Sequence, residues 1–325
     1  MDPDHLEMLA QIAEMYYISK LTQQQIAART GYSRSMISRL LTEAQHESVV
    51  EITINHPQQR NIELEHQLIA MLDLNTARIL KHSPSSYTEA LQMVGSLAAR
   101  YLSNLLNNDL VIGISWGTAI YETVKSLGWH PYQGIKVVQM LGSLGTPNPE
   151  IDGPELMWRL AEKVSARYSA FPVPLFVDSE TTRAALLNTP NSHEVLDSFR
   201  TIELALVGIG TVNPTQASLL RTGYISSGQL DSIRQAGAVG DVCVIHYDMY
   251  GNAVDTPITR RFLGIDRATF LRIPVKIGVA AGLIKAPAIL GACRAGLVNV
   301  LITDEFAANA ILNLISEEEE NHVRD

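Results

Sequence analysis

The chain has 325 residues, of which 46% are hydrophobic and 18% are charged. This length suits one small and one large domain, and no apolar run approaches the ~20 residues that cross a bilayer. The N-terminus has no charged-then-apolar signal peptide, and a formal net charge of −9 argues against a non-specific nucleic-acid coat protein. We expect a cytoplasmic protein without a membrane segment, a metal or another cofactor, in which Cys243 and Cys293 are buried thiols.

The stretch from residue 21 to residue 41 predicts a helix-turn-helix. Thr22 and Gln25 suit a capping box at the start of its first helix. Gly31 suits a left-handed turn position, and Ser33 suits the cap of the second helix. That helix would enter a major groove of DNA; the alternative is an ordinary helical hairpin with a solvated polar face. The residues that we expect to contact DNA are Thr22, Gln23, Ser33, Arg34, Ser35, Ser38 and Arg39.

The flanking segments complete a small domain and lead to the next one. An amphipathic helix at residues 4–18 would complete a three-helix core. The β-branched residues at 49–54 predict a strand that folds back as a wing. We therefore assign residues 1–57 to a winged helix-turn-helix domain and residues 58–75 to a linker helix. The apolar face of that helix either pairs with a second copy of itself or packs against the large domain.

From residue 76 to residue 325, short apolar runs alternate with amphipathic helices. Val- and Ile-rich strands in this arrangement predict an α/β domain with a doubly wound, mainly parallel sheet covered on both faces. The predicted strands are residues 77–80, 110–114, 135–141, 204–208, 242–246, 275–279 and 298–302. The predicted helices are residues 88–106, 118–127, 154–167, 228–235, 286–295 and 304–315, followed by a solvated, frayed tail at 317–320.

Three loops at predicted strand ends are rich in small residues: 113–118, 142–145 and 208–211. Ligands of such sheets gather at the carboxyl ends of the strands. Glycines let the backbone approach an anion, hydroxyls donate to it, and a helix N-terminus adds a favourable partial charge. The three loops together predict a phosphate site, although glycine in one such loop often serves packing alone.

Two charged residues stand in apolar surroundings. Asp241 precedes a hydrophobic strand, where its carboxylate either accepts hydrogen bonds from the hydroxyls of a polyol or caps a turn. Lys285 precedes Pro287, where its ammonium either pairs with a phosphate or is simply exposed. Asp304 is expected to cap the last helix.

The motifs that recur in a known family are Tyr-Tyr at 16–17, Leu-Thr-Gln at 21–23, Ile-Ser-Arg-Leu-Leu at 37–41, Gly-Ile-Ser-Trp-Gly-Thr at 113–118, Ala-Leu-Val-Gly-Ile-Gly at 205–210, Gly-Ala-Val-Gly-Asp at 237–241 and Gly-Val-Ala through Lys at 278–285. In combination they resemble the SorC/DeoR family of bacterial sugar-operon regulators over nearly the whole chain. The resemblance implies a winged helix-turn-helix and an effector domain similar in fold to ribose-phosphate isomerase and glucosamine-phosphate deaminase. It also implies a phosphorylated effector and an oligomer, often a tetramer.

Carried over by motif, the ligand site of the family falls on all three loops. Many relatives have a second hydroxyl directly after the position of Thr118, where this chain has Ala119. The resemblance implies that Ser115, Gly117 and Thr118 hold the phosphate with Lys285, and that Asp241 holds sugar hydroxyls. Gln139, Gly142 and Ser143 would line the pocket. The implied ligand-binding residues are Ser115, Gly117, Thr118, Gln139, Gly142, Ser143, Gly210, Asp241 and Lys285.

These observations predict a nucleoid-associated transcriptional regulator that represses a carbohydrate-utilisation operon. Its partners would be operator DNA, a phosphorylated sugar or polyol, and further copies of itself in a dimer or tetramer, because an acidic chain without a basic tail gains DNA affinity by binding in several copies. The alternatives are a sugar-phosphate isomerase or deaminase with Asp241 as general base, and a DNA-binding scaffold with a vestigial pocket. No histidine lies in a strand-end loop beside Asp241, so we assign no catalytic residue.

Overall fold

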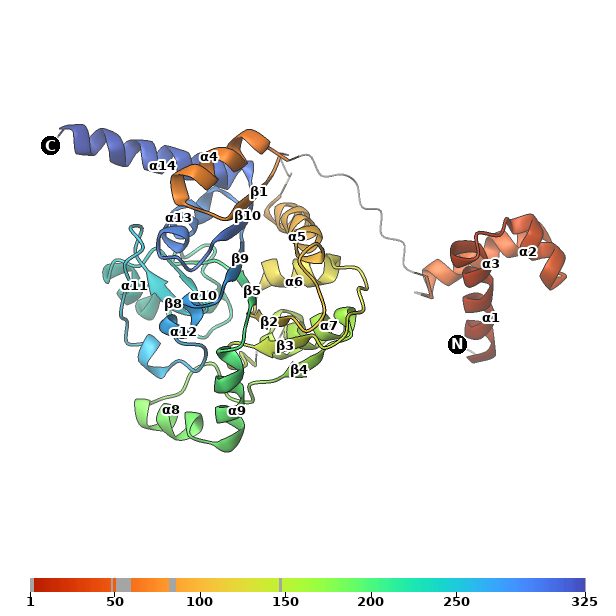
Figure 1. Ribbon diagram of the computed structural model, residues 1–325, viewed down its shortest axis with the longest axis horizontal. Coiled ribbons are helices and arrows are strands. Elements are labelled where there is room, and N and C mark those ends of the chain that lie inside the picture. The colour runs from red at the N-terminus through yellow and green to blue at the C-terminus, as the bar shows by residue number, and fades with distance from the viewer. Residues whose placement is uncertain (1–2, 48, 51–59, 82–85, 146–147, 325) are drawn as a thin grey trace. The chain divides into compact units, whose positions relative to one another are not determined.

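The computed structural model describes residues 3–47, 49–50, 60–81, 86–145 and 148–324 (Figure 1). The chain divides into two compact units, Met1–Pro57 and Gln58–Asp325. Among the described residues, buried side chains form one hydrophobic cluster in the small unit and two in the large unit. Each unit therefore has a core of its own.

The small unit is a bundle of three helices. Helix α1 (Pro3–Ala13) continues into a π-helical turn (Glu14–Ile18) and is followed by α2 (Gln23–Thr30) and α3 (Arg34–His46). Their apolar faces meet in a core of Leu9, Ile12, Ile26, Ile37, Leu40, Leu41 and Ala44. The predicted wing at residues 49–54 falls largely outside the described residues.

The connection between α2 and α3 uses the residues that the sequence predicts. The side chain of Thr22 accepts a hydrogen bond from Gln25 N, and the side chain of Gln25 accepts one from Thr22 N. Gly31 ends α2 with a φ of 77°, a left-handed conformation that favours glycine. Ser33 caps α3 by accepting a hydrogen bond from Met36 N at 3.2 Å.

The large unit is built on a seven-stranded parallel sheet in the order β1-β10-β9-β5-β2-β3-β4. The strands are β1 (Thr76–Leu80), β2 (Val111–Ile114), β3 (Lys136–Gln139), β4 (Arg167–Ser169), β5 (Leu204–Gly208), β9 (Val275–Val279) and β10 (Val300–Asp304). Apart from residues 242–246, the predicted strands are confirmed with ends that differ by at most two residues. The short edge strand β4 is not predicted, because it is largely exposed and has no apolar run.

Helices cover both faces of the sheet, because successive residues of a strand point to opposite sides. In β5, Leu206 packs into one buried cluster and its neighbour Val207 into the other. Figure 1 shows α5, α6 and α7 on one side of the sheet and α11 with α13 on the other. The helices are α4 (Ile62–Leu72), α5 (Tyr87–Ser103), α6 (Thr118–Ser126), α7 (Gly153–Val164), α8 (Glu180–Leu187), α9 (Pro190–Phe199), α10 (Ser218–Arg221), α11 (Ser227–Gln235), α12 (Arg267–Leu271), α13 (Ala286–Arg294) and α14 (Glu305–Arg324), with 3₁₀ turns at Pro149–Ile151, Thr259–Arg261 and Leu283–Lys285.

The strand order reverses between β2 and β5, which lie side by side in the sheet. After β2 the chain runs outward through α6, β3 and α7 to the edge strand β4. It then returns to β5 and continues in the other direction to β9 and β10. The helices that follow β2 and β5 pack on opposite faces, so the two loops diverge and leave a crevice at the carboxyl ends of these strands.

The predicted strand at residues 242–246 is wrong, because the chain turns back within it. Strands β7 (Gly240–Val242) and β8 (Ile245–Tyr247) pair antiparallel, and β6 (Gly210–Thr211) lies on the other side of β7. The two turn residues between β7 and β8 have φ values of 53° and 60°. Such turns usually carry Asn-Gly, so a Cys-Val pair gives no sequence signal for one.

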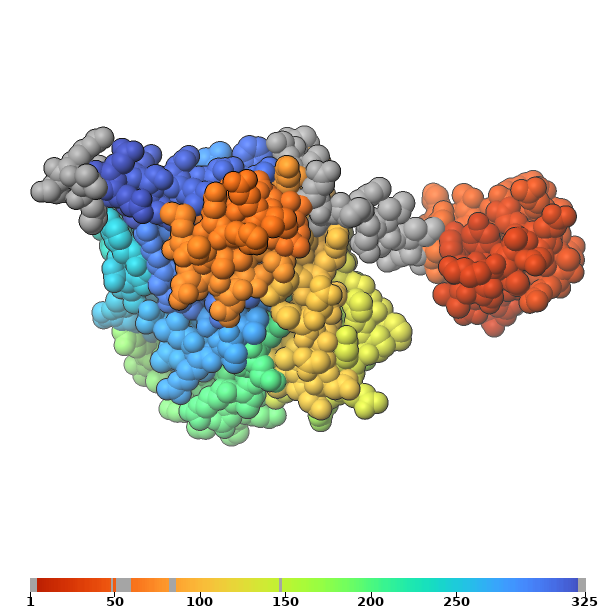
Figure 2. Space-filling view, turned by 45° about the horizontal axis from the view of Figure 1, so that its top comes forward, coloured from red at the N-terminus to blue at the C-terminus, as the bar shows by residue number. Residues whose placement is uncertain are grey.

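Helix α4 packs on the large unit, which is one of the two arrangements that the sequence leaves open. Its residues Leu64, Leu68 and Leu72 are buried in a core cluster of that unit. In the space-filling view the orange segment that contains α4 lies against the large unit beside the blue α14 (Figure 2). The residues assigned to a linker helix therefore include part of the large unit's own fold.

Helix α14 extends through the acidic run at residues 317–320, for which a frayed tail is predicted. Glu318 accepts hydrogen bonds from both terminal nitrogens of Arg294, at 3.1 and 2.7 Å. This ion pair favours the helical state of the run, and the frayed tail is thus corrected. Among the described residues, no helix combines the length and apolar character that a membrane span requires.

Candidate functional site

A pocket lies at the crevice where the strand order reverses. It contains about 670 Å³ of empty space, its open mouth included, and is bounded by the loops after β2, β5 and β9 and by strand β7. The sequence-predicted ligand residues that line it are Ser115, Gly117, Thr118, Gly210, Asp241 and Lys285. The sheet topology therefore brings together residues that are up to 170 positions apart in the chain, from 115 to 285.

One wall of the pocket is the start of α6. Gly117 is the N-cap residue with a φ of 121°, and no side chain caps the helix. The first N–H groups of a helix have no intrahelical acceptor, and they carry a positive partial charge. The hydroxyl of Ser115 is buried and accepts a hydrogen bond from Gly208 N at 3.3 Å, which ties the loop after β2 to the loop after β5. This wall can bind an anion.

Lys285 is the only lysine among the residues that line the pocket. The side chain is only 6% exposed, so the alternative of an exposed lysine is wrong. Its Nζ donates a hydrogen bond to Ile209 O at 2.7 Å. Burial lowers the pKa of Lys285 to about 8, and Arg221 adds to this shift while Asp241 opposes it. The ammonium is therefore charged at neutral pH in a poorly hydrated position, where it attracts anions strongly.

Asp241 faces Gly210 across the β6–β7 pair. A Cβ atom on Gly210 would lie 2.0 Å from Asp241 Oδ1, so a side chain at this position would displace the carboxylate. Asp241 Oδ2 accepts a hydrogen bond from Val244 N at 3.1 Å, which caps the strained β7–β8 turn. The carboxylate thus caps a turn and lines the pocket, and the two readings of Asp241 are compatible.

Three predicted ligand residues lie outside this pocket. Gln139 is 1% exposed; its Nε2 donates to Leu141 O at 2.7 Å, and its Oε1 accepts from Phe171 N at 3.1 Å. Gly142 and Ser143 run beside residues 171–175, where Ser143 N donates to Val173 O at 2.8 Å. The Gln139 amide and the N–H groups of residues 142–145 are therefore paired within the protein.

Tyr87 and Arg221 are among the lining residues that the sequence prediction does not include. Arg221 ends the four-residue helix α10 and is exposed, and among the described residues it forms no ion pair. Burial raises the pKa of the Tyr87 hydroxyl, and the nearby charge of Arg221 lowers it. Tyr87 begins a helix after a strand and could have been found by that position. Arg221 has no comparable signal.

No group of three or more His, Cys, Asp or Glu side chains that could hold a metal ion occurs in the part of the chain that the structure describes. Cys243 and Cys293 are buried free thiols, and burial raises the pKa of Cys293 to about 12. Both thiols are therefore protonated at neutral pH and are poor metal ligands in this state.

In the small unit, the outward face of α3 is polar. Arg34, Ser35, Ser38 and Arg39 are exposed, and the cap hydroxyl of Ser33 lies 2.9 Å from that of Ser35. Among the described residues, neither arginine is in an ion pair. On α2, Thr22 is exposed and Gln23 is half-buried. The seven predicted DNA-contact residues thus lie at the starts of α2 and α3 and along one face of α3.

The chain joins a parallel α/β unit, which has a charged pocket where the strand order reverses, to a helical unit with a polar exposed helix. This is the architecture of a ligand-responsive regulator. Residues 56–313 match the family of sugar-binding domains. The chain is 28% identical to the sorbitol operon regulator of Klebsiella pneumoniae over 313 residues, which are 95% of this chain and 98% of that protein. It is 31% identical to the transcriptional regulator LsrR of Enterobacter sp. (strain 638) over 312 residues, 95% of this chain and 93% of that one.

The structure agrees with these matches. The crystal structure of full-length sorbitol operon regulator SorC from Klebsiella pneumoniae matches with a TM-score of 0.74 at 27% identity and covers 96% of this chain and 100% of that chain. The protein therefore belongs to the SorC/DeoR family of sugar-operon transcriptional regulators. It is a DNA-binding regulator with a sugar-binding domain.

Proposed function

We propose that this regulator represses a carbohydrate-utilisation operon and that a phosphorylated sugar or polyol controls its affinity for the operator. The observation that carries the proposal is the meeting of Lys285, Asp241 and the start of α6 in one pocket. A cation and helix N–H groups favour an anion at one side, whereas a carboxylate favours hydroxyl donors. A sugar phosphate carries both kinds of group. One relative is named as the regulator of a sorbitol operon, which agrees with a carbohydrate ligand.

Within the pocket, the residues have separate tasks. The hydroxyls of Ser115 and Thr118 and the N–H groups at the start of α6 would hold the phosphate, with Lys285 as counter-charge. Asp241 would accept hydrogen bonds from sugar hydroxyls with the oxygen lone pairs that the Val244 N–H leaves over. Arg221 at the rim would add a second, more screened attraction for the phosphate.

For DNA, α3 is the proposed recognition helix of a winged helix-turn-helix domain, residues 1–57. Arg34 and Arg39 would contact phosphates or guanine edges, and Ser35 and Ser38 would lie beside the bases. We propose that a dimer or tetramer places two copies of α3 on two half-sites of the operator. Repression then depends on the quaternary arrangement that the effector favours.

A thermal-shift screen with sorbitol 6-phosphate, fructose 6-phosphate, glucose 6-phosphate and ribose 5-phosphate tests the effector. We expect at least one of them to raise Tm without being consumed, and turnover would instead indicate an isomerase. Retention of a labelled fragment from the protein's own promoter region at low salt tests the DNA function.

Arg39→Ala separates the two functions. It should weaken promoter binding about 10- to 100-fold through the loss of one base or phosphate contact, and it should leave the Tm rise intact. Arg200→Ala removes another exposed arginine, which lies in the large unit, and should change neither. Loss of the Tm rise in Arg39→Ala would contradict the division of tasks between the two units.

A further inference from the structure

The turn that carries Lys285 is held by the carboxylate of Asp304. Lys285 N donates to Gly282 O at 3.0 Å, and Gly282, with a φ of 89°, opens the turn. Gly282 N donates to Asp304 Oδ2 at 2.7 Å. Asp304 is fully buried at the end of β10. The position of the Lys285 turn therefore depends on this side chain.

The same carboxylate sets the start of α14. Asp304 Oδ1 accepts a hydrogen bond from Ala307 N at 2.8 Å, which confirms the predicted cap. The next residue, Glu305, accepts a hydrogen bond from Asn61 Nδ2 at 2.6 Å. One carboxylate therefore bonds both the Lys285 turn and the first turn of α14, and Glu305 extends this chain of contacts to Asn61.

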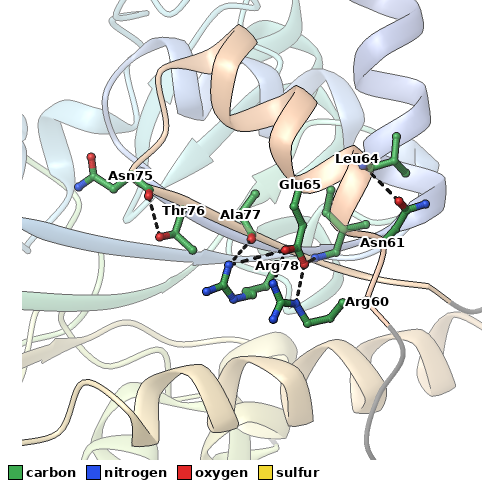
Figure 3. A network of polar contacts seen from close by, with 9 residues as sticks. Arg60, Asn61, Leu64, Glu65, Asn75, Thr76, Ala77 and Arg78 are labelled. Atoms are coloured by element: carbon green, nitrogen blue, oxygen red, sulfur yellow. Dashed lines mark hydrogen bonds and ion pairs between the residues drawn. The ribbon is translucent and has the colours of Figure 1, made fainter.

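Asn61 and Arg60 begin the described part of the large unit. Asn61 N donates to Ile79 O at 2.9 Å. Figure 3 shows the guanidinium groups of Arg60 and Arg78 meeting at the carboxylate of Glu65. Arg60 donates to Glu65 through two nitrogens, and Ile79 N donates to Glu65 Oε1 at 3.0 Å. Because Glu65 is only 2% exposed, these paired charges fix the geometry of the segment strongly.

The bond between Asn61 and Glu305 is not needed for either helix. Asn61 caps α4 with its other atom, since Oδ1 accepts from Leu64 N at 3.2 Å. Asp304 caps α14, so Glu305 is not required there. Each side chain therefore has a polar group that its own helix does not require. These two groups form a hydrogen bond between residues that are 244 positions apart in the sequence.

We propose that the Asn61–Glu305 hydrogen bond couples the effector pocket to the point where the chain leaves the large unit toward the DNA-binding unit. The inference rests on the proposed function, because it needs an effector that engages Lys285. An anion that draws the ammonium away from Ile209 O shifts the turn, Asp304 and the first turn of α14 together. Asn61 then passes this shift to the first described residues of the large unit, and the shift alters the affinity of the regulator for its operator.

A swap of donor and acceptor tests this relay in the full-length protein. Asn61→Asp keeps a good cap for α4 but removes the amide donor and sets two carboxylates against each other. The double variant Asn61→Asp with Glu305→Gln restores one hydrogen bond with the roles exchanged. Promoter affinity is measured with and without whichever of the four phosphates named above gives the largest rise in Tm. Asn299→Ala is the matched control. It removes two side-chain hydrogen bonds beside the opposite end of β10, in which Asn299 accepts from Lys276 N and donates to Pro274 O.

In the wild type we expect the phosphate to change promoter affinity by about 5- to 150-fold, which is the typical range for coupled sites. In Asn61→Asp the change should fall below about twofold, while the rise in Tm and the affinity for promoter DNA without effector persist. The double variant and Asn299→Ala should respond as the wild type does. Glu305→Ala serves as a second uncoupled variant if Asn61→Asp does not fold.

Two failures are distinguishable. If none of the four phosphates raises the Tm of the wild type, the proposed effector class is wrong and the relay falls with it. If the wild type responds and Asn61→Asp or Glu305→Ala keeps the full response, the effector class stands and the relay is overturned. Failure of the double variant to recover the response also overturns the relay, because the hydrogen bond would then not be the carrier.

Discussion

The loops after β2 and β3 have similar compositions but different structural roles. Both contain glycines and a serine hydroxyl, and both follow neighbouring strands of one sheet. The loop after β2 lines the pocket with several residues, whereas the loop after β3 contributes only Leu141 and otherwise packs against residues 171–175. The helices that follow these two strands, α6 and α7, cover the same face of the sheet, whereas the helix after β5 covers the other. A crevice therefore forms beside β2 on the side of β5 and not on the side of β3.

The glycines of the two loops differ accordingly. A Cβ atom on Gly117 would meet no atom within 4 Å, whereas one on Gly142 would lie 2.4 Å from Pro174 O. Gly117 leaves open space for a ligand, and Gly142 permits a close approach of two backbone segments. Glycine-rich loops at strand ends thus become sites only where the chain topology keeps their neighbours apart.

The largest expected effect is a loss of stability in Gly142→Ala. The new Cβ would collide with a backbone atom that cannot rotate away, and the change should lower the free energy of unfolding by about 2–3 kcal/mol. Urea unfolding measures it. Gly117→Ala is the matched change, which should cost about 1–2 kcal/mol through its positive φ alone while weakening phosphate binding. Equal stability of Gly142→Ala and the wild type would contradict the packing role of the loop after β3.

Lys285→Met tests the charge of the pocket. The loss of a charge-assisted hydrogen bond should weaken binding of a sugar phosphate by about 10- to 100-fold, measured by calorimetry. Stability should not fall, because a buried ammonium is replaced by an apolar side chain. Lys276→Met is the control: Lys276 is also 6% exposed, but its Nζ donates to Ile273 O away from the pocket. Equal weakening in both variants would remove Lys285 from the site.

The smallest effect is the pH dependence of that charge. Because burial lowers the pKa of Lys285 to about 8, the ammonium loses its proton as the pH rises through this value. Affinity for a sugar phosphate should therefore fall by up to about 10-fold between pH 7 and pH 9. Without ligand, the stability of the protein should instead rise with pH. Between about pH 8 and pH 10.4 the folded lysine is neutral while the unfolded one, with a pKa near 10.4, still binds a proton, so the cost of burying the charge is lost across this window. Lys285→Met should lack both trends, and an unchanged pH profile of binding in that variant would assign the titration to another group.

Local sequence signals determined much of this protein. The caps at Thr22 and Ser33 and the glycine at Gly31 fixed α2, α3 and their turn, because such signals act over one helical turn. The alternation of apolar runs and amphipathic helices likewise determined the parallel sheet, since each pattern records which face of an element is buried. The β7–β8 turn escaped prediction because tertiary packing holds Cys243 and Val244 in a conformation that neither residue favours.

Only the tertiary structure decided which polar residues share a site. Lys285 and Asp241 meet at the pocket because sheet order, not sequence distance, places β9, β5 and β2 next to each other. The same strand order leaves no crevice beside the loop after β3, where the side chain of Gln139 is hydrogen-bonded to the surrounding backbone. Capping and burial are properties of a few consecutive residues, whereas convergence depends on the whole path of the chain, and that path is settled only when all the layers pack together.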